Sequence, residues 1–249
     1  MKSNHTSLSV IVPVFNGERY VLPAIAALEK ELKGLNYEII ISDGGSSDKT
    51  AWLARDAMKD DRRLILLEPP KSERWRKARS FLEAARISKS PFIFYVDVDL
   101  STKPGQMRRF LRELQNADVV IGSRLMDGSK TERRFDREFL SRAYNFIVRL
   151  LLGSRIHDHQ CGFKAFRRES LMELARRTNN DHFFWDTEML VQAQRIGFVV
   201  KEVPVAWREG ASSTLNTISD SFSLFLEILR FRIELLKEDS KTPIKHNKI

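Results

Sequence analysis

The chain has 249 residues, of which 42% are hydrophobic, and this length and composition suit one large domain with a sizeable core. Lys and Arg together number 42 against 33 Asp and Glu, so the net charge of +9 favours an anionic partner: nucleic acid, nucleotide phosphates or an anionic membrane surface. The single cysteine, Cys161, excludes an intramolecular disulfide framework and a Cys-rich zinc site, and we expect a reducing compartment.

The first eight residues, MKSNHTSL, lack the apolar segment of a signal peptide. No stretch of the chain reaches the roughly 18 uncharged apolar residues that a membrane span needs. We therefore expect a cytoplasmic protein that is soluble or held peripherally at the cytosolic face of a membrane.

Short apolar runs typical of buried strands alternate with segments of helical spacing. The predicted strands are Leu8 to Phe15, Tyr37 to Ser42, Leu64 to Leu67, Phe92 to Val96 and Val119 to Ile121. Apolar residues recur at helical spacing between Val21 and Leu32 and between Met107 and Leu114. This order predicts one α/β domain over residues 1–218, with a mostly parallel sheet covered by helices on both faces.

Two carboxylates one residue apart, Asp97 and Asp99, follow the fourth predicted strand. Ligands of open α/β sheets bind at the carboxyl ends of the strands, and Asp43 ends the second strand at the same edge. Mg²⁺ and Mn²⁺ prefer oxygen ligands, and Mg²⁺ takes one or two carboxylates and completes its shell with water and phosphates. The pair therefore suggests a metal that holds a diphosphate, and the alternative is a turn with two solvated charges.

Five ordered motifs resemble the inverting family 2 glycosyltransferases of GT-A fold. They are LSVIVPVFNGE from Leu8, ISDGGSSDKT from Ile41, VDVDL from Val96, IGSR from Ile121 and DHQCGFKAFRR from Asp158. The last motif, together with WDTE from Trp185 and WREG from Trp207, is similar to dolichyl-phosphate glucosyltransferases and dolichyl-phosphate mannose synthases. The resemblance runs from about Leu8 to about Leu236.

This resemblance implies metal-dependent, inverting transfer of a hexose from GDP-mannose or UDP-glucose to a polyprenyl phosphate of the dolichyl type. A lipid phosphate is already anionic at neutral pH, so its attack needs no strong general base, whereas a hydroxyl acceptor would need proton removal. Transfer to a sugar hydroxyl stays an alternative. The basic surface also admits a nucleic-acid-binding module, but the Lys and Arg residues are spread along the chain without a recognised motif.

The resemblance also implies which residues bind the donor. These are Pro13, Asn16, Glu18, Asp43, Lys77, Asp97, Val98 and Asp99, with Asp97 and Asp99 as the ligands of Mg²⁺ or Mn²⁺. Asp43 would hydrogen-bond the base or ribose, although Gly44 replaces the family's second Asp, and a role as a turn residue is the alternative. Arg76 and Ala78 replace the glycines that flank the lysine in the family, so we expect side-chain contacts to phosphate from this segment.

On the sugar and acceptor side the resemblance implies Arg124, Asp158, Gln160, Lys164, Trp185 and Glu188, and it makes Asp97, Asp99, Arg124 and Asp186 catalytic. Asp186 and Glu188 are two residues apart on a predicted helix and cannot face the same way. We expect Asp186 to face the acceptor, with a structural role at a helix N-terminus as its competitor. His157 and His159 lack a second ligand cluster and receive no metal.

The C-terminal segment Ser219 to Lys237 predicts an amphipathic helix with two apolar stripes, followed by a flexible tail over residues 238–249. One stripe contains Phe222, Phe225, Leu226, Leu229, Ile233 and Leu236, and the other contains Leu224, Ile228, Phe231 and Leu235. We expect one stripe to pack on the domain and the other to meet an anionic bilayer or a partner. Burial against the mate of a homodimer is the alternative. Phe139 to Ile156 is a second candidate for membrane contact.

Overall fold

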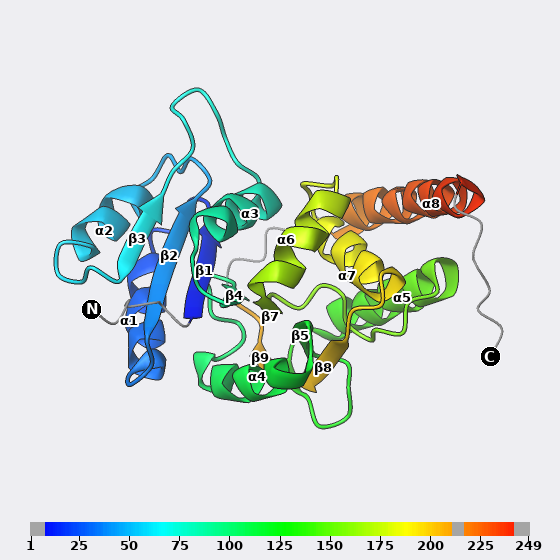
Figure 1. The fold of residues 1–249 in the computed structure, drawn as a ribbon, viewed down its shortest axis with the longest axis horizontal. Coiled ribbons are helices and arrows are strands. Elements are labelled where there is room, and N and C mark those ends of the chain that lie inside the picture. Colours follow the sequence, from blue (N-terminus) through cyan, green and yellow to red (C-terminus); the bar gives the residue numbers. More distant parts are fainter. Residues whose placement is uncertain (1–7, 211–216, 242–249) are drawn as a thin grey trace.

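A computed structural model describes residues 8–210 and 217–241 (Figure 1). The central sheet has seven strands in the order β3-β2-β1-β4-β7-β5-β8. Their bounds are Leu8–Val14 (β1), Tyr37–Asp43 (β2), Leu64–Leu67 (β3), Phe92–Val96 (β4), Val119–Ser123 (β5), Phe163–Arg167 (β7) and Val200–Pro204 (β8). A separate two-stranded sheet pairs β6 (Lys130–Glu132) with β9 (Ala206–Arg208).

The predicted mostly parallel sheet is confirmed, with one antiparallel member. Strands β3, β2, β1 and β4 run parallel, as do β5 and β8, and β7 lies antiparallel between β4 and β5. Strands β1 to β5 match the five predicted runs, whereas β7 coincides with the DHQCGFKAFRR motif and was not predicted as a strand. Asp43 at the end of β2 and Asp97 just after β4 lie at the same edge, as expected.

Both faces of the sheet are covered, because successive residues of the central strands point to opposite sides. Val10 and Val12 belong to the core that packs on one set of helices, while Ile11 between them belongs to the other core. The first set is α1 (Val21–Leu32), α2 (Thr50–Ala57) and α4 (Met107–Glu113), with 3₁₀ turns at Pro104–Gln106 and Leu114–Asn116. The second set is α3 (Lys77–Ile87), α6 (Arg168–Arg177) and α7 (Trp185–Arg195).

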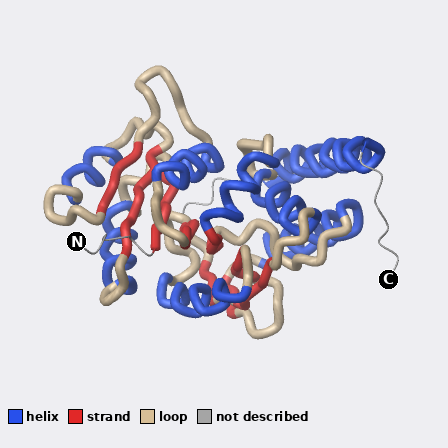
Figure 2. The backbone as a smooth tube through the Cα atoms, viewed as in Figure 1, coloured by secondary structure: helices blue, strands red, loops and turns tan. Residues whose placement is uncertain are grey.

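Helices α5 (Phe135–Leu152) and α8 (Thr217–Lys241) lie together at one end of the molecule, beyond α7 (Figures 1 and 2). They share a third core, in which Ile228, Phe231 and Leu235 of α8 meet Val148 of α5 and Phe184 beside α7. The sheet and its two helical layers therefore form one body, and α5 and α8 form an additional helical layer at its end.

The two predicted stripes of α8 have different surroundings. The stripe that contains Ile228, Phe231 and Leu235 is buried on the domain. The other stripe is exposed: Phe225, Leu226, Leu229, Ile233 and Leu236 are 37–52% accessible, while the side chain of Phe222 lies outside the described residues. The helix continues to Lys241, so residues 238–241 are helical instead of part of the predicted tail, and residues 242–249 lie outside the described part.

Near the end of α8, Asp239 forms an ion pair of 2.5 Å with Arg195 of α7. Within the described residues, no helix is long and apolar enough to cross a membrane.

Candidate functional site

A pocket of about 960 Å³ opens at the carboxyl edge of the sheet, where the ends of β2 and β4 meet α3, α5, α7 and α8. One part of its wall is charged and contains Arg74, Arg76, Lys77, Asp97, Asp99, Arg124, Arg133, Arg137, Asp186 and Glu209. The other part is largely apolar and contains Leu140, Ala143, Tyr144, Ile147, Phe183, Leu224, Phe225 and Ile228. The two parts are continuous, so a ligand with a polar head and an apolar tail suits the pocket.

Asp97 and Asp99 both line the charged part, and each carboxylate lies against a glycine. A Cβ atom on Gly162 would lie 1.7 Å from Oδ2 of Asp97, and one on Gly210 would lie 2.5 Å from Oδ2 of Asp99. Ser101 donates to Asp99 through its backbone amide and its hydroxyl. The glycines of the CGFK and WREG motifs thus leave the space that the two carboxylates occupy.

These two carboxylates fit a divalent cation. In the described part of the chain, no group of three or more His, Cys, Asp or Glu side chains could hold a metal by itself. Two carboxylates in an open, partly polar pocket match the needs of Mg²⁺ or Mn²⁺, which complete their shells with water and substrate phosphates.

Lys77 stands at the first position of α3 and reaches the same carboxylate. Its ammonium lies 2.5 Å from Oδ1 of Asp97, and the Tyr95 hydroxyl donates to that oxygen at 3.1 Å. Arg79, two residues further along α3, pairs with Glu73 and is half-exposed. Lys77, the cation that the family resemblance assigned to the donor, therefore lines the pocket.

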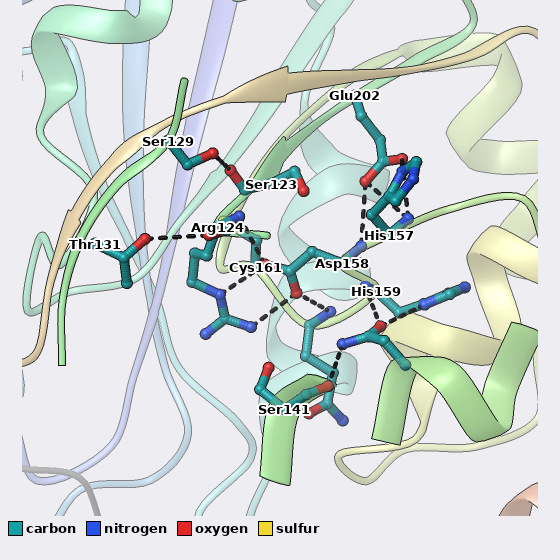
Figure 3. Close-up of polar contacts among 12 residues, drawn as sticks. Ser123, Arg124, Ser129, Thr131, Ser141, His157, Asp158, His159, Cys161 and Glu202 are labelled. Atoms are coloured by element: carbon teal, nitrogen blue, oxygen red, sulfur yellow. Dashed lines mark hydrogen bonds and ion pairs between the residues drawn. The ribbon is translucent and has the colours of Figure 1, made fainter. Parts of the chain in front are cut away.

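Arg124 forms an ion pair with the buried Asp158 that sequence reasoning did not identify (Figure 3). Its Nε and Nη2 donate to the two carboxylate oxygens of Asp158 at 2.7 and 2.8 Å, and its backbone amide donates to Asp158 as well. Burial raises the pKa of Asp158, but the charge and hydrogen bonds of Arg124 outweigh it and bring that pKa to about 2. Arg124 lines the pocket, whereas Asp158 lies behind it as the partner that orients the guanidinium.

Lys164 of β7 also lies behind the pocket. Its side chain is fully buried, and its ammonium donates to Oδ1 of Asp186 at 2.7 Å and to the carbonyl of Cys161 at 2.6 Å. Asp186, in the first turn of α7, lines the pocket together with Gln160. The predicted acceptor residues are thus brought together, but Lys164 acts on Asp186 instead of contacting the pocket.

Glu188 faces away from the pocket, in agreement with the expectation that Asp186 and Glu188 cannot point the same way. It is buried and accepts the backbone amides of Asn179 and Asn180, both at 2.9 Å. Trp185 does line the pocket, packed against Phe81. Glu188 therefore holds the loop before α7, a structural role in place of the predicted acceptor contact.

Three residues predicted to bind the nucleotide sugar, Asp43, Asn16 and Glu18, do not line the pocket that the described residues form. Each of them accepts hydrogen bonds from backbone amides instead. Asp43 is buried and accepts the amides of Gly45 and Ser46 at 3.1 and 2.9 Å, which is the turn role given as its alternative. Asn16 accepts the amide of Ser47, and Glu18 accepts the amide of Lys49. Pro13, inside β1, and Val98, packed on the core, are likewise absent from the lining.

The two histidines and the cysteine have structural surroundings. His157 contacts Glu202 (Figure 3). His159 is buried, and its ring nitrogens contact Asn145 and Ser154. Burial lowers the pKa of His159 to about 3, so its imidazole is neutral. Cys161 is fully buried, and burial raises the pKa of its thiol to about 12.

Several lining residues were missed by sequence reasoning. Arg133 lies between β6 and α5, and Arg137 lies in the first turn of α5; both belong to the segment ERRFDRE, whose mixed charges give no periodic signal. Arg137 pairs with Glu209 at 2.7 Å, and the Trp207 ring lies under both Arg124 and Arg133. Trp207 and Glu209 belong to the WREG motif, which was noted without a role.

Comparison with known proteins gives a family and a fold. The model of glycosyl transferase family 2 matches residues 9–175. Glycosyltransferase AglD of Haloferax volcanii is 34% identical over 90% of this chain, but the match spans only 36% of AglD. Dolichyl-phosphate beta-glucosyltransferase of Dictyostelium discoideum is 31% identical over 92% of this chain and 75% of that protein.

The fold resembles a solved glucosyl-3-phosphoglycerate synthase from Mycobacterium tuberculosis, crystallised with Mn²⁺, UDP and glucosyl-3-phosphoglycerate. The TM-score is 0.69 at 18% identity, with 91% of this chain and 80% of that chain covered. At this identity the likeness supports the GT-A fold alone.

Proposed function

We propose that this chain, which belongs to glycosyltransferase family 2, transfers a hexose from a nucleotide-diphosphate sugar to a polyprenyl phosphate. The observation that carries the proposal is the continuity of the pocket, which leads from Asp97 and Asp99 to an apolar wall built by α5 and α8. A sugar or peptide acceptor has no need of such a wall. The relatives named dolichyl-phosphate beta-glucosyltransferase support a lipid phosphate acceptor and glucose as the hexose.

The donor belongs at the charged part of the pocket. Asp97 and Asp99 would hold a divalent cation, which supplies positive charge against the diphosphate that leaves with the nucleotide. A structural neighbour of the same fold was crystallised with Mn²⁺ and UDP. Lys77 is placed to contact a diphosphate oxygen through its ammonium, and Arg74 and Arg76 line the same side.

The acceptor enters from the apolar part, with its phosphate toward the sugar. Its oxygen is anionic before the reaction, so no side chain has to remove a proton. Asp186, held by the ammonium of Lys164, then orients the reacting groups in place of acting as a strong base. Direct displacement at the anomeric carbon inverts it and gives a β-linked polyprenyl-phosphate sugar.

The outer surface of α5 and α8 is suited to the membrane that holds such a lipid. Large apolar side chains of α5, namely Phe135, Phe139, Phe146 and Leu150, are 63–84% accessible, and the exposed stripe of α8 adds to them. Arg230, Arg232 and Lys237 on α8 are exposed and can meet anionic headgroups. A second copy of the chain is the competing occupant of this surface.

A donor panel tests the proposal. UDP-glucose, GDP-mannose and related nucleotide sugars are offered with a short polyprenyl phosphate, with Mn²⁺, with Mg²⁺ or with EDTA, and lipid-linked sugar is measured. We expect one donor to dominate, EDTA to stop transfer, and Asp99→Asn to be inactive while Asp60→Asn, an exposed carboxylate outside the pocket, is normal. Transfer that resists EDTA, or that survives Asp99→Asn, would contradict the metal assignment.

A further inference from the structure

Arg133 lines the pocket with hydrogen-bond donors that meet no hydrogen-bond acceptor in the described part of the chain. Its Nε and Nη1 atoms are buried, and within the described residues neither meets a hydrogen-bond partner. Buried polar groups in folded proteins are almost always paired, because leaving an N–H group without an acceptor costs its lost hydration. A buried N–H group without a partner calls for an explanation, and a bound ligand that supplies a hydrogen-bond acceptor is one.

Among the described residues, no carboxylate forms an ion pair with Arg133. Its guanidinium carbon lies 5.4 Å from the centre of the Trp207 ring, and that of Arg124 lies 5.5 Å from the same ring. Arg124 is neutralised by Asp158, and the nearby carboxylate of Glu209 lies 2.7 Å from Arg137. Burial and the charge of Arg124 lower the pKa of Arg133, which reflects the same surplus of positive charge.

The place of Arg133 in the pocket indicates the kind of anion. It directly follows β6 and precedes α5, the helix whose Leu140, Ala143 and Ile147 form part of the apolar wall. Arg133 therefore lies beside Trp207 and Arg124 in space, and along the chain it stands directly before the helix that carries the apolar wall. A compact anion at the head of an apolar chain would bring its oxygens to this point.

We propose that Arg133 binds the phosphate monoester of the acceptor, and that this contact makes the enzyme select a phosphate over an uncharged hydroxyl head. A guanidinium presents several N–H donors in a planar fork that suits phosphate oxygens, which would satisfy Nε and Nη1 together. The inference rests on the proposed function for the reaction, but it concerns a residue outside the five motifs that carry the family resemblance.

The test compares Arg133→Gln and Arg133→Lys with the control Arg134→Gln in the full chain. Arg134 is the next residue, its side chain is 74% exposed, and it pairs with Asp136 outside the pocket. Each variant is assayed with the preferred nucleotide sugar and Mn²⁺, at varied concentrations of polyprenyl phosphate. We expect Arg133→Gln to raise the KM for the acceptor roughly ten- to a hundredfold, with partial recovery in Arg133→Lys and none of the effect in Arg134→Gln.

Two further measurements separate this role from a structural one. Calorimetric titration with the nucleoside diphosphate and Mn²⁺ should give the wild-type Kd in Arg133→Gln, because the donor site is intact. A short alkyl phosphate should inhibit the wild type better than an alkyl sulfate of equal chain length, and the variant should lose that preference. Comparing inhibition by the short alkyl phosphate with inhibition by inorganic phosphate shows whether the headgroup or the alkyl chain accounts for this preference.

An unchanged acceptor KM in Arg133→Gln, or a rise in the donor Kd equal to the change in acceptor KM, would overturn the inference. A lower melting temperature with an unchanged preference for phosphate over sulfate would overturn it as well, and would assign Arg133 to the fold. If the wild type transfers hexose to no phosphate acceptor, it is the proposed function that fails. Transfer by the wild type together with a normal Arg133→Gln variant leaves that function in place and rejects the role of Arg133.

Discussion

The ammonium of Lys77 lies 2.5 Å from the carboxylate of Asp97, so the first residue of α3 meets the end of β4 inside the pocket. The pair brings a donor for phosphate oxygens next to a candidate metal ligand. A diphosphate bound at this point would contact the ammonium of Lys77 directly and Asp97 through a divalent cation, so removing either side chain should weaken its binding.

We predict that Lys77→Ala lowers kcat/KM for the nucleotide sugar roughly ten- to a hundredfold, the usual loss for one charged hydrogen bond to phosphate. Steady-state kinetics at saturating Mn²⁺ measure it. Arg79→Ala is the matched control on the same helix, because Arg79 is half-exposed and pairs with Glu73. Equal kinetics in the two variants would reassign Lys77 to the surface.

Gly162→Ala should inactivate the protein without unfolding it. The added methyl would overlap Oδ2 of Asp97, and the carboxylate is the movable end of a side chain, so the carboxylate shifts and the backbone stays. We expect Mn²⁺ and nucleotide binding to fall at least tenfold while the melting temperature changes little. Gly105→Ala is the control, since its Cβ would have open space apart from a contact of 3.8 Å with Glu31. Normal metal affinity in Gly162→Ala would show that the position of Asp97 is not critical.

Asp158→Asn should destabilise the fold, because it leaves the buried guanidinium of Arg124 without its counter-charge. Losing one partner of a buried pair costs about 3 kcal/mol or more near pH 7. Because the pKa of Asp158 is lowered to about 2 in the folded protein, its contribution is present above the unfolded pKa near 4 and disappears as pH falls toward 2.

Urea unfolding at several pH values measures this contribution. The wild type should lose roughly 2 kcal/mol more than Asp158→Asn between pH 4 and pH 2. Asp56→Asn, an exposed partner of Lys59, should follow the wild type. Parallel pH curves for wild type and Asp158→Asn would contradict the assigned pair.

The two stripes of α8 should respond differently to substitution. Ile233→Asn with Leu236→Asn changes side chains that are half-exposed and outside the pocket, so we expect weaker binding to anionic vesicles and unchanged stability. Phe231→Ala empties a buried position against Phe184 and should cost about 3 kcal/mol of stability.

Vesicle sedimentation and thermal unfolding separate the two effects. If Ile233→Asn with Leu236→Asn spares vesicle binding but converts a dimer to a monomer, the exposed stripe is a subunit interface instead.

The strands β1 to β5 were predictable because each is an apolar run of strand length, and β3 and β4 have the bounds that the sequence indicates. Strand β7 was not, because Lys164 interrupts its apolar run. The burial of that lysine is offset by hydrogen bonds that its ammonium donates to Asp186 and to the Cys161 carbonyl, which are tertiary contacts.

The candidate site likewise contains residues that the sequence predicted and contacts that it could not predict. Asp97, Asp99, Lys77 and Asp186 were found from their positions at strand ends and in motifs, and all four line the pocket. The pairing of Arg124 with Asp158, 34 residues later, depends on β7 lying between β4 and β5 and has no local signal.

The most direct test of the account offers two lipids of equal chain length, a polyprenyl phosphate and the corresponding polyprenol, with the preferred nucleotide sugar and Mn²⁺. The account predicts that the wild-type protein forms a β-linked polyprenyl-phosphate hexose and leaves the alcohol unmodified. Faster transfer to the alcohol, or to a soluble sugar hydroxyl, than to the lipid phosphate would contradict it.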